Sequence, residues 1–450
     1  MFYTYPHCTG FRDSCEVSAM ICRQYIYIIP PFFIHFNYFA STNYEVSFGD
    51  FAAIASRFSW RSNNLTRCPI GDIISAWQGI YSQKEMLRLK NTFGSSVSVT
   101  IFGESHGCAI GAVLDGMASG VPVDEEFIAH QMNLRKSVGA ISTPRHEADR
   151  VKIVSGVFNG RTTGTPITFI IENEDTRSRD YGELAYKARP GHADFPAEMK
   201  YHGYQDFRGG GHFSGRITAG LVAAGAVAIS ALKTKNITIG THILTCAGVS
   251  DRSFGDIPSD IEKLANAEFA VLDDSVRELM TEKIEAAKND GDSVGGRLET
   301  AVYGFPSGVG EPWFDTVESV ISHILFSVPA VKGVEFGDGF ALADMRGSEA
   351  NDCYRSENGR VVTTSNHNGG ITGGITNGMP IIFRTAIKPT PSIYKEQETI
   401  DMRTNENTTL QIKGRHDPAI IHRARVVIDS VTALALCDQL ALRYGTDMNF

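Results

Sequence analysis

The sequence predicts an α+β protein built in layers. Short segments in which apolar and polar residues alternate, as in half-buried strands, are separated by a few helical patterns, most of them long. The segment Ile217–Leu232 is apolar on nearly every face, so the helix that it predicts has to be packed on both sides. The chain has no run of strand-helix-strand units, no GxxxxGK(S/T) motif and no GxGxxG between a strand and a helix, so Walker-type and Rossmann-type folds are unsupported.

Each element is predicted from its own pattern. Alternation predicts strands, in chain order, at Val97–Phe102, Val151–Gly160, Pro166–Glu172, Arg297–Tyr303 and Met379–Ile387. Apolar residues at helical spacing predict helices at Asp124–Leu134, Ile217–Leu232, Ile261–Ala267, Ser275–Ala287, Phe314–Phe326 and Ala419–Leu442. The two helices between residues 256 and 290 are the most polar and are expected at the periphery. The segment from Pro329 to Gly339 is interpreted as a loop that presents Lys332.

The amino-acid composition is that of a globular protein with a negative net charge. The 450 residues are 42% apolar and 21% charged, which is ample for a core. A net charge of −9 argues against a general binder of nucleic acid or of anionic membranes, so an anionic ligand would need clustered cations at its site. The eight cysteines form neither a CxxC pair nor a zinc-ligand spacing, and we interpret them as reduced thiols of a cytoplasmic protein with no metal site.

Residues 1–85 differ in composition from the rest of the chain. They hold four of the eight cysteines and show no sustained helical or strand period. The apolar run Tyr25–Ala40 is interrupted by two prolines and is too short to span a bilayer, and neither a secretory signal nor a transit peptide matches. We therefore expect residues 1–85 to be an N-terminal extension, either an incorrectly assigned start upstream of Met86 or a poorly ordered segment, and residues 86–450 to form the functional domain.

Glycines and cationic side chains gather between Arg189 and Arg216. Arg-Pro-Gly-His at 189–192 and Arg-Gly-Gly-Gly-His-Phe-Ser-Gly-Arg at 208–216 directly precede the apolar helix. Glycine amides, arginine forks and the positive end of a helix together can hold an anion. The alternative is a tight glycine turn with solvated arginines, which is the commoner use of either feature alone.

Other glycine or proline loops carry further reactive side chains. His106 lies in a glycine-flanked loop at a predicted strand end, Arg135 and Arg145 flank a second loop, and Asp417 stands between His416 and Pro418. Loops at strand ends can converge on one pocket, in which histidines would move protons and arginines would hold an anion. Solvation of the basic loop is an equally good interpretation. These residues predict an enzyme that acts on a small phosphorylated or polycarboxylate ligand by proton transfer.

Six ordered motifs resemble the signatures of the chorismate synthase family. They are, as they stand in this sequence, Gly103-Glu-Ser-His-Gly107, Arg189-Pro-Gly-His-Ala-Asp194, Arg208-Gly-Gly-Gly211, Gly291-Asp-Ser-Val-Gly295, Lys388-Pro-Thr-Pro-Ser392 and Gly414-Arg-His-Asp-Pro418. The resemblance extends from about Asn91 to Tyr444. Each motif by itself is weak evidence for the family, whereas the six motifs in this order are together specific for it.

The resemblance implies a fold and a reaction. The family's fold is a β-α-β sandwich in which long helices lie between antiparallel sheets, and its usual state is a homotetramer. Its members are carbon-oxygen lyases that remove phosphate and a ring proton from 5-enolpyruvylshikimate 3-phosphate in a 1,4-anti elimination, giving chorismate for aromatic amino acid biosynthesis. The family needs reduced FMN without net oxidation, and NADPH is a candidate reductant for the flavin.

The resemblance also implies site residues. The expected proton-transfer residues are His106, His192 and Asp417. The expected ligands of the substrate and its phosphate are Arg135, Arg145, Arg189 and Arg216. The expected FMN contacts are His212, Phe213, Ser214, Pro329, Ala330, Gly373, Lys388, Pro389, Thr390, Pro391, Ser392 and Arg415.

Two stretches depart from the commoner family pattern. His212-Phe-Ser-Gly-Arg-Ile-Thr218 replaces Arg-Ser-Ser-Ala-Arg-Glu-Thr, and Asn133-Leu-Arg-Lys-Ser-Val-Gly139 replaces an arginine-rich stretch, which places Arg135 only to within a residue or two. Two other functions stay open beside the reaction of the family. One is an FMN-dependent NAD(P)H reductase that keeps the flavin pocket, and the other is a catalytically silent relative.

Overall fold

The computed structural model describes residues 91–136, 139–142, 148–174, 185–412 and 417–447. These residues belong to the unit that begins at Leu89. The expectation that residues 1–85 are an extension falls outside the described residues, as do Arg145 and Arg415 of the expected site.

Two five-stranded antiparallel sheets form the framework. The first has the strand order β1 (Thr92–Phe93), β2 (Ser98–Gly103), β3 (Ala109–Asp115), β7 (Ile167–Glu172) and β4 (Val151–Ser155). The second has the order β11 (Val331–Phe336), β16 (Ile381–Ile387), β10 (Gly296–Tyr303), β8 (Thr238–Cys246) and β9 (Val249–Ser250). All neighbouring strands run antiparallel, so the α+β prediction is confirmed.

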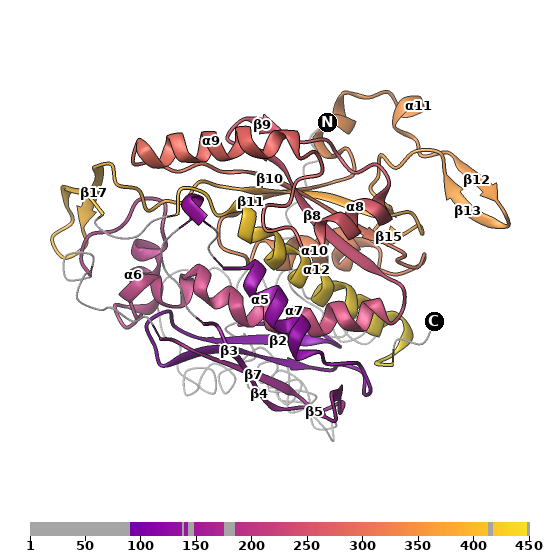
Figure 1. The fold of residues 1–450 in the computed structure, drawn as a ribbon, viewed down its shortest axis with the longest axis horizontal. Coiled ribbons are helices and arrows are strands. Elements are labelled where there is room, and N and C mark those ends of the chain that lie inside the picture. Colours follow the sequence, from indigo (N-terminus) through magenta and orange to yellow (C-terminus); the bar gives the residue numbers. More distant parts are fainter. Residues whose placement is uncertain (1–90, 137–138, 143–147, 175–184, 413–416, 448–450) are drawn as a thin grey trace, which may run out of the picture. The chain divides into compact units, whose positions relative to one another are not determined.

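Four helices lie between the sheets. They are α5 (Glu125–Leu134), α7 (Thr218–Lys233), α10 (Val317–Leu325) and α12 (Ile421–Tyr444). Helix α7 packs on β3 of the first sheet and on α12, which in turn packs on β8 of the second (Figure 1). The two helices cross closely at Gly225, where a Cβ would lie 2.3 Å from the Cβ of Ser430. Any side chain at position 225 would therefore push the two layers apart.

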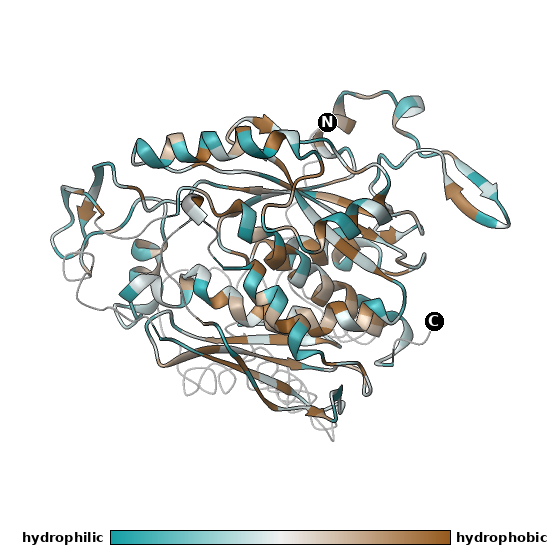
Figure 2. Cartoon of the chain, viewed as in Figure 1, coloured by the Kyte–Doolittle hydropathy of each residue, from teal (hydrophilic) through white to brown (hydrophobic). Residues whose placement is uncertain are grey.

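The core helix α7 has the burial that its composition predicts. The window Gly215–Lys233 is long and apolar enough to cross a membrane, but 89% of it is buried inside the protein. A helix that is apolar all round and buried in this way is the core helix of a globular fold. Figure 2 shows apolar residues concentrated where the helices face the sheets.

The peripheral elements cover the other side of the second sheet or project from the framework. Helix α8 (Ile257–Leu264) packs on β8 and β10, and α9 (Ser275–Asn289) lies beside β9, with a largely hydrophilic outer surface (Figures 1 and 2). The remaining elements are short: β5 (Val157–Phe158), β6 (Arg161–Thr162), α6 (Asp194–Tyr201), α11 (Gly347–Ala350), β12 (Tyr354–Glu357), β13 (Arg360–Thr363), β14 (Ile371–Thr372), β15 (Ile375–Thr376), β17 (Gln397–Asp401) and β18 (Glu406–Leu410). The strands among them pair as two-stranded hairpins, in chain order.

Three sequence predictions need correction. The segment interpreted as a loop around Lys332 contains strand β11, which pairs with β16 and has a register shift between Val331 and Gly333. This bulge, with Gly333 beside it, hid the alternation of the strand. The strand predicted at 151–160 ends at Ser155, since Gly156 has a φ of 80° and a Cβ there would lie 2.6 Å from the Pro166 carbonyl oxygen. Helix α8 begins at Ile257, four residues before its predicted start, because a proline at its first turn opens it.

A buried row of charges crosses the outer face of the second sheet. His242, Glu299 and Arg384 are cross-strand neighbours on β8, β10 and β16. His242 bonds Asp251 through Nδ1 (3.1 Å) and Glu299 through Nε2 (3.2 Å), and Arg384 Nε donates to Glu299 (2.9 Å). Burial alone would lower the pKa of His242, but these two carboxylates raise it above its usual value.

Replacing His242 by glutamine is expected to change the pH dependence of stability. A raised histidine pKa stabilises the fold below about pH 6.5, and this contribution disappears as pH rises through the folded-state pKa. The pKa values of Asp251 and Glu299 are lowered, so their contribution is present above about pH 4 and disappears as pH falls. The stability difference between wild type and His242→Gln should be larger by roughly 1–2 kcal/mol at pH 6 than at pH 9. Urea unfolding at both pH values tests this, and an equal difference at both would contradict a charged His242.

Candidate active site

His106 lies in the turn between β2 and β3, at one end of the strands of the first sheet. Its side chain is buried, and Nδ1 lies 3.1 Å from Ser105 Oγ. Ser105 Oγ donates to the Arg208 carbonyl oxygen at 3.1 Å, and since a carbonyl only accepts, the hydroxyl accepts from His106 Nδ1. This network assigns the proton of the neutral ring to Nδ1 and makes Nε2 its basic nitrogen.

The three glycines at 209–211 bring two histidines to one turn. Their φ values are 61°, 91° and 54°, a run of left-handed conformations that only glycines adopt without strain. A Cβ at Gly209 would lie 2.2 Å from Cε1 of His106, and a Cβ at Gly210 would lie 3.0 Å from Cε1 of His192. The glycines are therefore required because two imidazoles pack against the turn from either side.

His192 belongs to a second charged group with Arg189 and Asp194. Asp194 accepts from Arg189 Nε and Nη2, both at 2.7 Å, and from His192 Nδ1 at 2.8 Å. Although burial opposes ionisation, the bonds from Arg189 and His192 hold the pKa of Asp194 well below its usual value. The carboxylate thus fixes both the guanidinium and the imidazole.

A second buried carboxylate joins two arginines. Arg135 Nη2 donates to Asp149 at 2.6 Å, and Arg216 Nη1 donates to the other oxygen of the same carboxylate. Burial opposes ionisation here too, but the two guanidiniums keep the pKa of Asp149 low. Arg216 Nε also donates to Asn173 (3.0 Å), whose amide donates to the carbonyl oxygens of Glu104 and Gly107. The arginine pair is thereby tied to the loop that carries His106.

Within the described ranges, two buried polar atoms near these clusters are left without a hydrogen-bond partner. Nε of Arg135 is buried and has no hydrogen-bond partner in the described part of the chain. The same is true of the hydroxyl oxygen of Thr390. Buried polar atoms are normally satisfied, so an unpaired donor next to a cationic cluster is a place where a bound anion can accept a hydrogen bond.

The segment 388–392 lies against the His192 loop. Lys388 Nζ donates to the Gly191 carbonyl oxygen at 2.6 Å, and a Cβ on Gly191 would lie 3.2 Å from the Cβ of Pro391. The backbone N–H of Lys388 donates to Ala330, a residue with a φ of 76° in the turn after Pro329. The expected FMN contacts Pro329, Ala330 and Lys388 to Ser392 therefore border the loop that carries His192.

The three residues after the glycines have structural contacts of their own. His212 Nδ1 lies 2.8 Å from the Gly103 carbonyl oxygen and Nε2 lies 3.3 Å from Asn91 Oδ1, so both ring nitrogens have protein partners. Ser214 Oγ accepts from the backbone N–H of Arg216. Phe213 is 38% exposed and lines a hollow together with Ala193, Phe207 and Gly210. Of the three, Phe213 has a side chain turned to open space.

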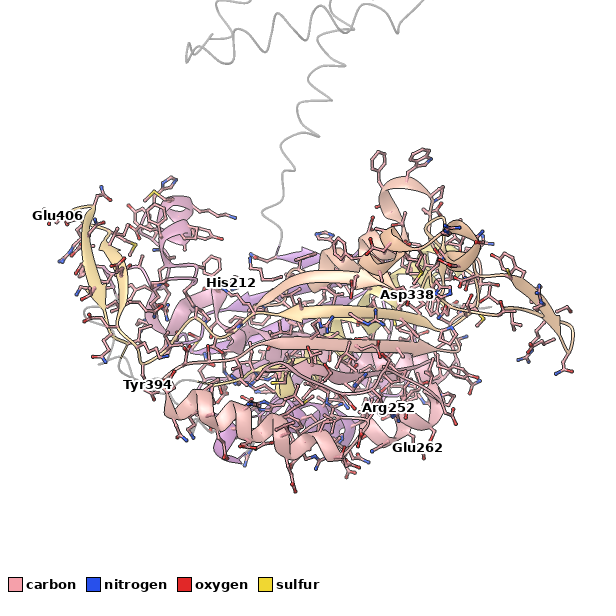
Figure 3. All side chains as sticks on the ribbon, turned by 90° about the horizontal axis from the view of Figure 1, so that it is seen from above. His212, Arg252, Glu262, Asp338, Tyr394 and Glu406 are labelled. Atoms are coloured by element: carbon pink, nitrogen blue, oxygen red, sulfur yellow. The ribbon has the colours of Figure 1, made fainter. Side chains whose placement is uncertain are left out.

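Gly373 lies away from this cluster. It is in the turn between β14 and β15, just before β16, whereas Lys388 directly follows the last residue of β16. Figure 3 shows Tyr394, which follows the 388–392 segment, at one end of the second sheet, and Asp338 at the opposite end. The backbone N–H of Asp338 donates to the carbonyl oxygen of His367, which precedes the turn that holds Gly373, so this turn belongs to the end of the sheet where Asp338 lies. The structure does not bring Gly373 together with the other expected FMN contacts.

Asp417 pairs with a cation that sequence reasoning did not identify. Arg423, in the first turn of α12, donates to the Asp417 carboxylate. Arg423 also lies close enough to Arg135 to lower its pKa, in addition to the larger effect of burial. Asp417 is therefore on the side of the site that holds the arginine pair.

The described residues contain no group of three or more His, Cys, Asp or Glu side chains that could hold a metal ion. The four cysteines among them, Cys108, Cys246, Cys353 and Cys437, are free thiols.

Comparison with known proteins places this cluster in a family. The family model described as chorismate synthase matches residues 97–441. The chain is 44% identical to the chorismate synthase of Thermococcus kodakarensis over 78% of its own length and 97% of the relative's. It is 45% identical to that of Aeropyrum pernix over 79% and 93%. A solved structure described as a crystal structure of chorismate synthase matches with a TM-score of 0.63 and 29% identity, covering 79% of this chain and 94% of that one. The chain belongs to the chorismate synthase family.

Proposed function

We propose that the protein catalyses the 1,4-anti elimination of phosphate from 5-enolpyruvylshikimate 3-phosphate to give chorismate. The observation that carries this proposal is the glycine turn with an imidazole packed on either side, next to a buried arginine pair. An elimination that expels phosphate and removes a ring proton needs proton carriers and cations in one place. The 44% identity to relatives named chorismate synthase supports the same reaction.

In this proposal each cluster has its own task. The ring C–O bond breaks and its electron pair leaves with phosphate, while the electrons of a ring C–H bond form the new double bond and the proton is taken up by a base. Arg135, Arg189 and Arg216 would stabilise the negative charge that grows on the phosphate. His106, once protonated at Nε2, would donate that proton to the leaving phosphate or to the cofactor. His192 and Asp417 would serve as further proton carriers.

The residues present fit a flavin mononucleotide. The hollow lined by Phe207, Phe213 and Gly210 is shallow and does not enclose a flavin by itself, but its apolar side chains would contact one edge of a flat ring system bound beside His192. The unpaired Thr390 hydroxyl and the Lys388 ammonium offer polar partners for ring or phosphate oxygens. Reduced FMN would supply electron density to the departing phosphate and recover it afterwards. Pro329, Ala330, Ser392 and Arg415 are further proposed contacts, and NADPH is a proposed reductant.

We also propose that the protein acts in the cytoplasm as a homotetramer. Trp313, Phe314 and Phe340 are 84%, 90% and 84% exposed in the single chain, which is unusual for large apolar side chains. Association of copies would bury such residues.

Anaerobic turnover of the purified full chain tests the proposed reaction. The protein is mixed with dithionite-reduced FMN and 5-enolpyruvylshikimate 3-phosphate, and phosphate release is followed together with chorismate absorbance. We expect equimolar phosphate and chorismate, no turnover with oxidised FMN, and no net consumption of reduced flavin. Bound FMN without phosphate release, together with NAD(P)H oxidation, would instead identify a flavin reductase. Neither binding nor turnover would identify a catalytically silent relative.

A further inference from the structure

The loop at residues 290–295 connects two segments of the proposed site. It lies between α9 and β10 and contains one of the six family motifs, yet none of its side chains belongs to the proton-transfer or arginine clusters. Ser293 Oγ donates to the Thr390 carbonyl oxygen at 2.7 Å. The backbone N–H of Val294 donates to the Pro418 carbonyl oxygen at 2.8 Å. One short loop therefore holds both the 388–392 segment and the residue next to Asp417.

The loop at residues 290–295 also contacts the chain on both sides of the 388–392 segment. A Cβ on Gly295 would lie 2.4 Å from the Ile387 carbonyl oxygen, so the loop backbone packs directly on the chain just before Lys388. Beyond the segment, the backbone N–H of Tyr394 donates to Gly291 at 2.9 Å. Lys395 Nζ lies 2.5 Å from the carboxylate of Asp290 and 2.9 Å from that of Asp292. Ser293 supplies the side-chain bond at the middle of the segment.

We infer that Ser293 is a positioning residue for the proposed reaction. Its hydroxyl fixes the Thr390 carbonyl, and so sets the conformation of the turn from which the unpaired Thr390 hydroxyl and the Lys388 ammonium are presented. Loss of this one bond leaves a half-buried carbonyl oxygen without its donor, and the Thr390 peptide group is then no longer held in one orientation. Because the inference concerns the proposed flavin contacts, it rests on the proposed function.

Ser293→Ala tests the inference through two readouts that do not depend on turnover. The first is amide hydrogen exchange of the 388–395 peptide in the full chain without ligands, which should become about 5- to 10-fold faster. The second is the Kd for FMN, measured by quenching of flavin fluorescence, which should rise about 5- to 10-fold. Ser293→Thr keeps the hydroxyl and should restore both values to within about 2-fold of wild type.

The matched control is Ser155→Ala. Ser155 Oγ also donates to a carbonyl oxygen, that of Pro166 at 2.9 Å, but on β4 of the first sheet. This variant should leave both readouts unchanged. Unchanged exchange at 388–395 in Ser293→Ala, or faster exchange with an unchanged Kd, would overturn the positioning role. If the wild-type protein does not bind FMN, the proposed cofactor is wrong and the positioning role fails with it. Faster exchange and a higher Kd in Ser293→Ala, with neither change in Ser155→Ala, would support both the cofactor and the positioning role.

Discussion

Replacing His106 by alanine is expected to lower kcat of the proposed elimination about 10²- to 10⁴-fold, with KM changed by less than about 3-fold. The imidazole is buried beside Gly209 with its Nδ1 bonded to Ser105 Oγ, and its task in the proposed reaction is proton transfer, so the loss should fall on kcat more than on KM. Steady-state phosphate release under anaerobic conditions gives both constants. A fall in kcat/KM that arises from KM alone would show that His106 binds substrate and does not transfer the proton.

Two variants separate proton transfer from the placement of the ring. Ser105→Ala removes the hydroxyl that accepts from Nδ1 but keeps the imidazole, and we expect a loss of about 10-fold at most. His130→Ala removes a histidine of α5 whose Nε2 contacts the Ala265 carbonyl oxygen away from the site, and it should leave kcat within about 2-fold of wild type. If Ser105→Ala were as damaging as His106→Ala, placement of the ring and not its proton would dominate.

Local patterns predicted the elements whose burial is uniform. The sequence located helices α7 and α12 to within two residues at each end, because a helix between two layers buries nearly all of its side chains and so shows a continuous apolar pattern. The glycine triplet and His106 could also be singled out, because several other loops of the chain combine glycine or proline with cationic or titratable side chains, although each feature alone more often has a structural use. Strand β11 was missed because a bulge breaks its alternation, and β8 because its two faces are both buried.

The sequence could not predict which residues far apart in the chain contact one another. Asp149 stands in a polar stretch with no period, and nothing near it in the chain shows that it binds Arg135 and Arg216 from two other segments. Likewise the motif pattern places Gly373 with the flavin contacts, but β16 separates it from Lys388 within this chain. The identity of a salt-bridge partner depends on topology, and topology depends on how whole layers pack.

Replacing Asp149 by asparagine is expected to lower the free energy of unfolding by about 3–5 kcal/mol. The carboxylate is the shared counter-charge of two buried guanidiniums, with side-chain exposures of 9% for Arg135 and 5% for Arg216. Asparagine has nearly the same shape but no charge, and it turns an amide donor towards one of two groups that can only donate. Both arginines would then be buried as like charges without compensation, and Arg216 would lose its place beside Asn173.

Equilibrium denaturation of Asp149→Asn and of a matched exposed pair tests this expectation. Asp206 pairs with Arg208, whose side chain is 42% exposed, so Asp206→Asn should cost no more than about 1 kcal/mol. Because the pKa of Asp149 is lowered in the folded protein, its stabilisation is present above the usual carboxyl pKa and is lost as pH falls through the folded-state value. Wild type and Asp149→Asn should therefore differ most near neutral pH and converge in acid. A loss for Asp149→Asn no larger than that for Asp206→Asn would mean that water or another carboxylate compensates the arginine pair, and that the cluster is more open to solvent than its burial indicates.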